Sequence, residues 1–257
     1  MVRFSPVFVI LINVFFFLFD SDASAASRRI PKPLINEFTL NGQIPVSYNY
    51  KVPMKNESIF YQSDLFNSNI QKALSKQPGF LEETDVHLYR ALDDFADRIR
   101  GEKVAVIGSK DAWYESILLA YGANPVVIDS MKINSSDSRV TYLTFEEFAA
   151  NPQKFALILS LTKIADEGLG LDGSPIDPNA DLKSMQIIRD MLEPNGLLML
   201  AVPVGPDRLV WNSHRIYGQK RLKMLVTGWK NIRYYGFTSE HVFFGIGYRP
   251  VFLVTPK

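Results

Sequence analysis

The spacing of apolar residues predicts strands that alternate with helices along the second two thirds of the chain. From Thr84 to Ile99 the apolar positions recur at helical spacing and Gly101 follows, so we expect a helix that Thr84 caps. Beyond it, short β-branched runs and amphipathic stretches succeed one another. Strands are expected at 104–107, 125–128, 140–143, 155–161, 197–202, 232–236 and 251–254, and helices at 113–121, 145–150, 177–192 and 220–226.

This order of elements predicts an α/β fold with a mostly parallel sheet. Strands that alternate with helices form a sheet between two helical layers, which is a three-layer Rossmann-like arrangement. The run 155–161, FALILSL, is apolar throughout, as expected of a parallel strand buried on both faces. Only a loop is expected between the last two strands, so they should form an antiparallel hairpin that completes a seven-stranded sheet.

Residues 1–26 have the three-part pattern of a secretory signal peptide. Arg3 precedes an apolar run over 7–19, and an A-x-A site ends at Ala25, so we expect cleavage there or one residue later. The run is shorter than the roughly 20 residues that span a bilayer. An uncleaved anchor, which would attach the protein to a membrane, is the alternative. Under both hypotheses the rest of the chain lies in the secretory lumen or outside the cell.

Residues 27–83 are rich in Pro, Asn and Ser, and they predict an extended lead-in, free or partly packed on the domain, with one short helix at 64–76. The α/β domain then occupies residues 84–257. Two glycosylation sequons agree with a secretory route: one begins at Asn56, and the other at Asn134 in a polar turn between expected strands. The chain has no cysteine, so no disulfide framework is expected.

Composition narrows the class of function. The net charge is +1, so the chain lacks the excess of basic residues that is typical of nucleic-acid-binding proteins. No nucleic-acid partner is therefore expected. The one basic cluster, Lys220, Arg221 and Lys223, is expected to be a solvated helix face. His87 and His241 are isolated in the sequence, no two histidines have metal-ligand spacing, and cysteine is absent, so no metal site is expected.

The first predicted strand and the second end in residues that suit a nucleoside pocket. In parallel sheets, ligands bind beyond the carboxyl ends of the strands, near the point where strand order reverses. Gly108 leaves the first strand at a sharp turn, and Asp129 ends the second strand 21 residues later, where a carboxylate can accept hydrogen bonds from ribose hydroxyls. Ser109 and Ser160 lie at the same edge and complete the expected cofactor site. The alternative is a tight turn beside a solvated Asp129.

The loop after Gly108 departs from a dinucleotide fingerprint. Lys110 and Ala112 occupy the places of the later glycines, which disfavours close approach by a diphosphate. S-adenosylmethionine has no phosphate and demands less of this loop. The Lys110 cation would lie near the sulfonium of that cofactor unless it points to water.

Four stretches carry a family resemblance: VIGSKDAWYE, LILSLTKIADEGLGLDGSPIDPNADLKSM, EPNGLLMLAVPVG and NSHRIYGQKRL. From about residue 84 onward the chain resembles an uncharacterised, nematode-rich family of unknown function with the class I S-adenosylmethionine-dependent methyltransferase fold. The resemblance implies the strand order 3-2-1-4-5-7-6 and S-adenosylmethionine as cofactor. This chain has Ala165 and Asp166 where members often carry Glu-His, so an imidazole is missing there.

The segment after the fifth strand, PVGPDRLVWNSHRIYG, should border the same pocket. Asn212, His214, Arg215 and Tyr217 are the expected substrate-binding residues, with Arg215 suited to a carboxylate or phosphate. The alternative is that His214 and Tyr217 hydrogen-bond backbone and lock a long loop. Asp166 and its neighbour Glu167 are candidates for acid/base work, the alternative being solvated loop acids.

Three hypotheses about function follow. The first is methyl transfer from S-adenosylmethionine to an unknown acceptor, a small molecule or a protein, in the secretory pathway. The second is a catalytically inactive domain that keeps the fold for binding or scaffolding, because fold alone does not decide function. The third, a nicotinamide-dependent oxidoreductase, is disfavoured by the missing loop glycines.

Overall fold

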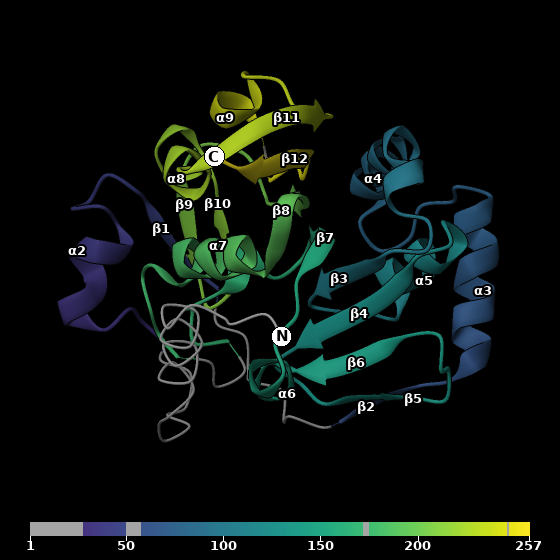
Figure 1. Cartoon of the computed structure of the whole chain (residues 1–257). Coiled ribbons are helices and arrows are strands. Elements are labelled where there is room, and N and C mark those ends of the chain that lie inside the picture. Colours follow the sequence, from purple (N-terminus) through teal and green to yellow (C-terminus); the bar gives the residue numbers. More distant parts are fainter. Residues whose placement is uncertain (1–27, 50–57, 172–174, 246) are drawn as a thin grey trace.

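Seven strands form the central sheet of the computed structural model, which describes residues 28–49, 58–171, 175–245 and 247–257. The expected signal peptide and Asn56 lie outside the described residues. In chain order the seven strands are β3 (Lys103–Ile107), β4 (Asn124–Asp129), β6 (Thr141–Thr144), β7 (Phe155–Ser160), β8 (Leu192–Ala201), β11 (Trp229–Tyr235) and β12 (Val251–Pro256). They lie side by side in the order β6-β4-β3-β7-β8-β12-β11 (Figure 1).

Counted along the chain, this order is 3-2-1-4-5-7-6, so the predicted topology is confirmed. All pairs from β6 to β8 are parallel, and β12 is antiparallel to both β8 and β11. A short helix, α9 (His241–Phe244), stands between β11 and β12, where only a loop was expected. The hairpin is still antiparallel, because one turn of helix is too short to cover the sheet and return the chain in parallel.

The apolar runs are continuous because the central strands are buried on both faces. In β3, Val104 and Val106 belong to one core cluster while Ala105 and Ile107 belong to the other. Side chains of successive residues in a strand point to opposite faces, so each strand contributes to both cores.

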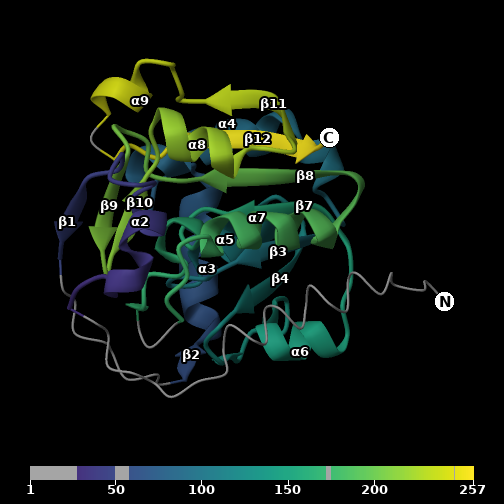
Figure 2. The ribbon, with the colours of Figure 1, turned by 90° about the vertical axis from the view of Figure 1, so that its left-hand side faces the viewer.

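Helices cover both faces of the sheet (Figure 2). One face carries α3 (Ser63–Leu74), α4 (Glu82–Asp94) and α5 (Trp113–Ala120), and the other carries α6 (Phe145–Ala150), α7 (Ala180–Met191) and α8 (Gln219–Leu225). The capping box of Thr144 and Glu147 fixes the start of α6 at the predicted residue. The predicted cap of α4 was wrong: the helix begins at Glu82, and the Thr84 hydroxyl donates instead to the Arg249 carbonyl at 2.8 Å.

The lead-in packs on the domain and contains more regular structure than the one expected helix. It contains η1 (Lys32–Leu34), α2 (Ile35–Phe38), β1 (Val46–Tyr48) and β2 (Ile59–Tyr61). β1 pairs with β9 (Arg208–Trp211), which in turn pairs with β10 (His214–Ile216), and β2 pairs with β5 (Ile133–Ser135). A third apolar cluster joins the lead-in to the domain: Ile30, Phe38, Ile44, Leu169, Leu209 and Trp211. No helix within the described ranges is long and apolar enough to cross a membrane.

Candidate functional site

Gly108 and Asp129 lie together at the carboxyl edge of the sheet. The backbone at Gly108 has φ +79°, a left-handed conformation that favours glycine, and a Cβ there would lie 3.2 Å from the Lys163 Cβ. The next amide, Ser109 N–H, donates to Asp129 Oδ2 at 3.0 Å. The turn at Gly108 is therefore linked to Asp129 across the neighbouring strands β3 and β4. It lies beside the boundary between β3 and β7, where the strand order of the sheet reverses.

Asp129 is 7% exposed, and donors of the chain itself fill some of the acceptor positions of its carboxylate. Besides Ser109 N–H on Oδ2, the Met131 amide donates to Oδ1 at 3.0 Å and the Ser130 hydroxyl donates to it at 3.3 Å. A carboxylate has about four acceptor positions. At least one therefore remains on Oδ2 for a ligand hydroxyl.

The rest of the loop is left-handed without glycine. Asp111 and Ala112 have φ +55° and +51°, which costs of the order of 1–3 kcal/mol per residue. The lead-in holds the loop there, because Asp111 N–H donates to the Tyr61 hydroxyl and the Asn69 amide donates to the Asp111 carbonyl, both at 3.0 Å. The Lys110 ammonium was expected near the sulfonium unless it points to water. In the structure it lies 3.7 Å from the centre of the Phe80 ring, in a cation–π contact.

A buried carboxyl that the sequence did not single out also supports the loop. Glu115, in the first turn of α5, is fully buried and accepts hydrogen bonds on Oε1 from the Ser109 hydroxyl and from the Tyr142 hydroxyl. Its Oε2 has no hydrogen-bond partner among the described residues. Burial raises the pKa of Glu115, and the charge of Asp129 adds to the increase. An acid inside an apolar helix face was not recognisable from spacing alone.

The end of β7 contributes two further groups. Ser160 is fully buried, and its hydroxyl has no partner in the described part of the chain. Glu167 follows η3 (Ile164–Asp166), its side chain is only 18% exposed, and the Lys163 ammonium lies 3.9 Å from its Oε1. Burial raises the pKa of Glu167, and the Asp129 charge acts in the same direction. Glu167 is thus not the solvated loop acid of the alternative hypothesis.

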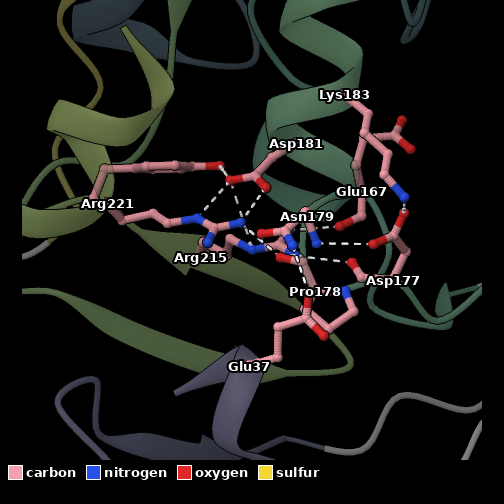
Figure 3. Close-up of polar contacts among 10 residues, drawn as sticks. Glu37, Glu167, Asp177, Pro178, Asn179, Asp181, Lys183, Arg215 and Arg221 are labelled. Carbon is pink, nitrogen blue, oxygen red and sulfur yellow. Dashed lines mark hydrogen bonds and ion pairs between the residues drawn. The ribbon is translucent and has the colours of Figure 1, made fainter. Parts of the chain in front are cut away.

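The predicted acceptor residues lie in or next to the β9–β10 hairpin, and Figure 3 shows the polar contacts of one of them, Arg215. The Arg215 guanidinium, 4% exposed, donates to the carbonyls of Glu167 at 2.5 Å, Pro178 at 3.3 Å and Asp177 at 3.4 Å. The Tyr217 hydroxyl is fully buried and donates to Asp181 Oδ2 at 3.0 Å.

The remaining two predicted acceptor residues are also held by the chain. The Asn212 amide, at the hairpin turn, donates to the Leu169 carbonyl at 3.0 Å, and His214 Nδ1 lies 2.9 Å from the Ser213 hydroxyl. Together with Arg215 and Tyr217, these contacts match the alternative in which the segment is a locked loop. A role of the four residues in acceptor binding stays a prediction.

One buried carboxylate organises this region. Asp181 is completely buried, and Arg221 donates to both of its oxygens while also donating to the Pro178 carbonyl at 2.6 Å. Burial acts to raise the pKa of Asp181, but the guanidiniums of Arg215 and Arg221 hold it below its usual value. The expectation of a solvated basic helix face was wrong for Arg221, which is 3% exposed.

The histidines that are isolated in the sequence meet in the fold. His87 Nε2 hydrogen-bonds to the Tyr248 hydroxyl, and the His241 ring stacks on Tyr248 with 5.0 Å between ring centres. Tyr248 thus lies between two histidines that are far apart in the sequence. Among the described residues no group of three or more His, Cys, Asp or Glu side chains could hold a metal ion.

The sheet order, together with a glycine turn and a strand-end carboxylate at the point of reversal, defines a methyltransferase-like α/β domain. More particularly, the chain belongs to the family described as Caenorhabditis protein of unknown function, DUF268, whose model matches residues 101–244. A comparison with curated protein sequences finds no match.

Solved structures of methyltransferases are similar to this chain at low sequence identity. The Burkholderia thailandensis 1,6-didemethyltoxoflavin-N1-methyltransferase, with bound S-adenosylhomocysteine, is 15% identical over 76% of this chain and 88% of that chain, with a TM-score of 0.45. The magnesium protoporphyrin IX methyltransferase of Synechocystis PCC 6803 is 13% identical over 76% and 97%, with a TM-score of 0.42. The mitomycin 7-O-methyltransferase is 11% identical over 68% of this chain, with a TM-score of 0.44, and the chain spans 56% of its length.

Proposed function

We propose that the domain binds S-adenosylmethionine at the carboxyl ends of β3 and β4 and transfers its methyl group to an acceptor. The observation that carries this proposal is the contact of the Ser109 amide with Asp129 beside the left-handed Gly108. The glycine turn lets a ligand approach the backbone, and the carboxylate offers Oδ2 to a ribose hydroxyl. The acceptor is a small molecule or a protein.

The side chains around the loop supply positioning and a proton acceptor. The bound cofactor would supply an electrophilic methyl group, so alignment of the acceptor accounts for much of the rate increase. Glu167 is the candidate general base, because it follows η3 near the end of β7, close enough to Asp129 to feel its charge, and burial raises its pKa. Ser109 is kept in place by Glu115 and Asp129 together.

The second candidate function is a non-catalytic binding or scaffold domain. It is favoured by the loop's own contacts: Asp129 already accepts from the Ser109 and Met131 amides, and Tyr61 and Asn69 clamp Asp111. Because the polar groups of the loop find hydrogen-bond partners within the chain, the loop can be ordered without a bound ligand.

The protein is proposed to act in the secretory lumen or outside the cell. The signal-peptide pattern of residues 1–26 supports this location, and so does Asn134, whose side chain is exposed. Asn134 lies in β5, not in the turn that the sequence predicted, and it remains accessible to glycosylation. If glycosidase treatment of protein from its native host leaves the mass unchanged, this location is contradicted. A chain that still begins at Met1 contradicts cleavage of the signal peptide and leaves the uncleaved anchor.

Calorimetry with S-adenosylmethionine and S-adenosylhomocysteine tests the function. Asp129→Asn keeps the shape but weakens a charged hydrogen bond that contributes about 1.5–3 kcal/mol, so affinity should fall about ten-fold or more. Asp97→Asn, an exposed acid outside the site, is the matched control and should bind as wild type does. Thermal unfolding identifies variants that are folded. If the folded wild type binds neither nucleoside at millimolar concentration, the non-catalytic function stands instead.

A further inference from the structure

Arg249 brings a guanidinium to the edge of the sheet where the candidate site lies. β12 is antiparallel to β8, with Val251 opposite Ala201, so the residues just before β12 lie beside the carboxyl end of β8. From there the Arg249 side chain reaches past β8, and its Nη1 lies 3.4 Å from the carbonyl of Leu161, the residue after β7. The guanidinium therefore lies near the end of β7, the strand at the point of reversal.

Few of the N–H groups of the Arg249 guanidinium donate hydrogen bonds to the chain. A guanidinium has five N–H groups. In the part of the chain that the structure describes, the long bond to Leu161 is the one hydrogen bond of this guanidinium, and no carboxylate lies within 4 Å of it. Asp166 acts on it only as a more distant charge. Arg215 and Arg221, by contrast, are each bonded to two or more backbone or carboxylate oxygens.

The unpaired donors of Arg249 remain accessible, although the side chain is partly buried. Arg249 is half-buried, and burial lowers its pKa, although an arginine keeps its proton at neutral pH. Tyr114 is 1% exposed and close enough to feel the Arg249 charge, but its hydroxyl lies beside the buried Asp85 carboxylate. No nitrogen of Arg249 is among the fully buried polar atoms that lack a partner in the described residues, so its free donors are open to water and to a ligand.

We propose that Arg249 binds an oxyanion, a carboxylate or phosphate group of a small-molecule ligand. The planar fork of N–H groups matches two oxygens of such a group. The proposal stands on Arg249 and its neighbours and does not require the proposed cofactor. Two sources would present the same chemistry: the carboxylate of the cofactor's amino-acid part, or an acidic group on the acceptor.

Anion titrations test the site itself. Inorganic phosphate and succinate would be titrated into the full-length protein as expressed, with binding followed by calorimetry and by the shift in unfolding temperature. At least one anion should bind the wild type, and Arg249→Gln should weaken it about ten-fold or more. Arg208→Gln, an exposed arginine on β9, should bind as wild type does. Arg249→Lys, which keeps the charge but loses the fork, serves if Arg249→Gln fails to fold, and it should also weaken binding.

Two nucleosides distinguish the sources. S-adenosylhomocysteine carries the carboxylate and 5′-methylthioadenosine lacks it. If Arg249→Gln weakens only the former, the cofactor is the source. If it leaves both unchanged but abolishes anion binding to protein saturated with S-adenosylhomocysteine, the acceptor is the source. Binding of anions that depends on Arg249, without binding of either nucleoside, supports the oxyanion site and refutes the proposed function. If neither anion nor S-adenosylhomocysteine distinguishes Arg249→Gln from wild type, the oxyanion site is refuted.

Discussion

Replacement of Arg215 by Met should destabilise the protein, because the guanidinium supports the fold in the structure. It is 4% exposed, donates to the carbonyls of Glu167, Asp177 and Pro178, and lies 3.7 Å from Asp181 Oδ2. Methionine keeps most of the volume of the arginine stem and removes only the charge and the donors. The change therefore isolates the polar contacts from the packing.

The expected loss of stability in Arg215→Met follows from the buried groups that lose their partner. Removing one partner of a buried ion pair costs about 3–5 kcal/mol, and the lower end applies here because Arg221 still contacts Asp181. For a protein of this size, roughly 2–4 °C of unfolding temperature is lost per kcal/mol, so Arg215→Met should unfold about 6–12 °C lower.

The sign of the pH dependence also follows. Because the folded-state pKa of Asp181 is lowered, its contribution to stability is present above its unfolded pKa of about 3.9 and is lost as pH falls through the folded pKa. Arg215→Met should raise the folded-state pKa of Asp181 toward its unfolded value, so less stability should be lost at acid pH than in the wild type.

Thermal unfolding followed by circular dichroism, from pH 3 to pH 8, measures both effects. Arg208→Met is the matched control: Arg208 lies on the same hairpin but is exposed, and its replacement should change stability by less than about 0.5 kcal/mol. If Arg215→Met unfolds within 2 °C of this control, the guanidinium does not support the fold, and its predicted role in acceptor binding becomes the better explanation.

Two further predictions concern the loop and its support. Burial raises the folded-state pKa of Glu115, so its protonation favours the folded state and stability falls as pH rises from about 4.3 through the folded pKa; Glu115→Gln should flatten this decline in urea unfolding series, and an unchanged slope would contradict the assignment. Gly79→Ala places a Cβ 2.4 Å from Trp113 Cε2, so it should cost about 1–3 kcal/mol by overpacking and change the tryptophan fluorescence, whereas Gly42→Ala, with no atom within 4 Å, should leave that fluorescence unchanged.

The sheet was predictable because its strands carry the information locally. Runs such as Phe155–Ser160 are apolar over their whole length, and the helices between them have one apolar face, so period and order determine the topology. The lead-in was not predictable in the same way. β1, β2 and β5 are each three residues long, too short for a period to show, and their partners lie far away in the sequence.

The cofactor half of the candidate site was predictable because strand ends determine it. Gly108 and Asp129 end adjacent parallel strands, so the carboxyl-edge rule brings them together without knowledge of packing. Glu115 owes its character to complete burial and to an unpaired oxygen atom. Neither property is a feature of residue type, so no pattern in the sequence distinguishes it from an ordinary helix residue.

The two arginines show why the binding half was harder to predict. Arg215 follows the fifth strand of the sheet and has the right residue type, yet Asp181 and three carbonyls from residues 167–178 already surround it. Arg249 precedes the last strand, where the sequence shows only a loop, yet one carbonyl is its hydrogen-bond partner in the described chain. Whether an arginine can bind a ligand depends on how many acceptors the fold places around it. For Arg215 the number of acceptors is set by the packing of α7 and η3 against the β9–β10 hairpin, and not by its position relative to a strand end.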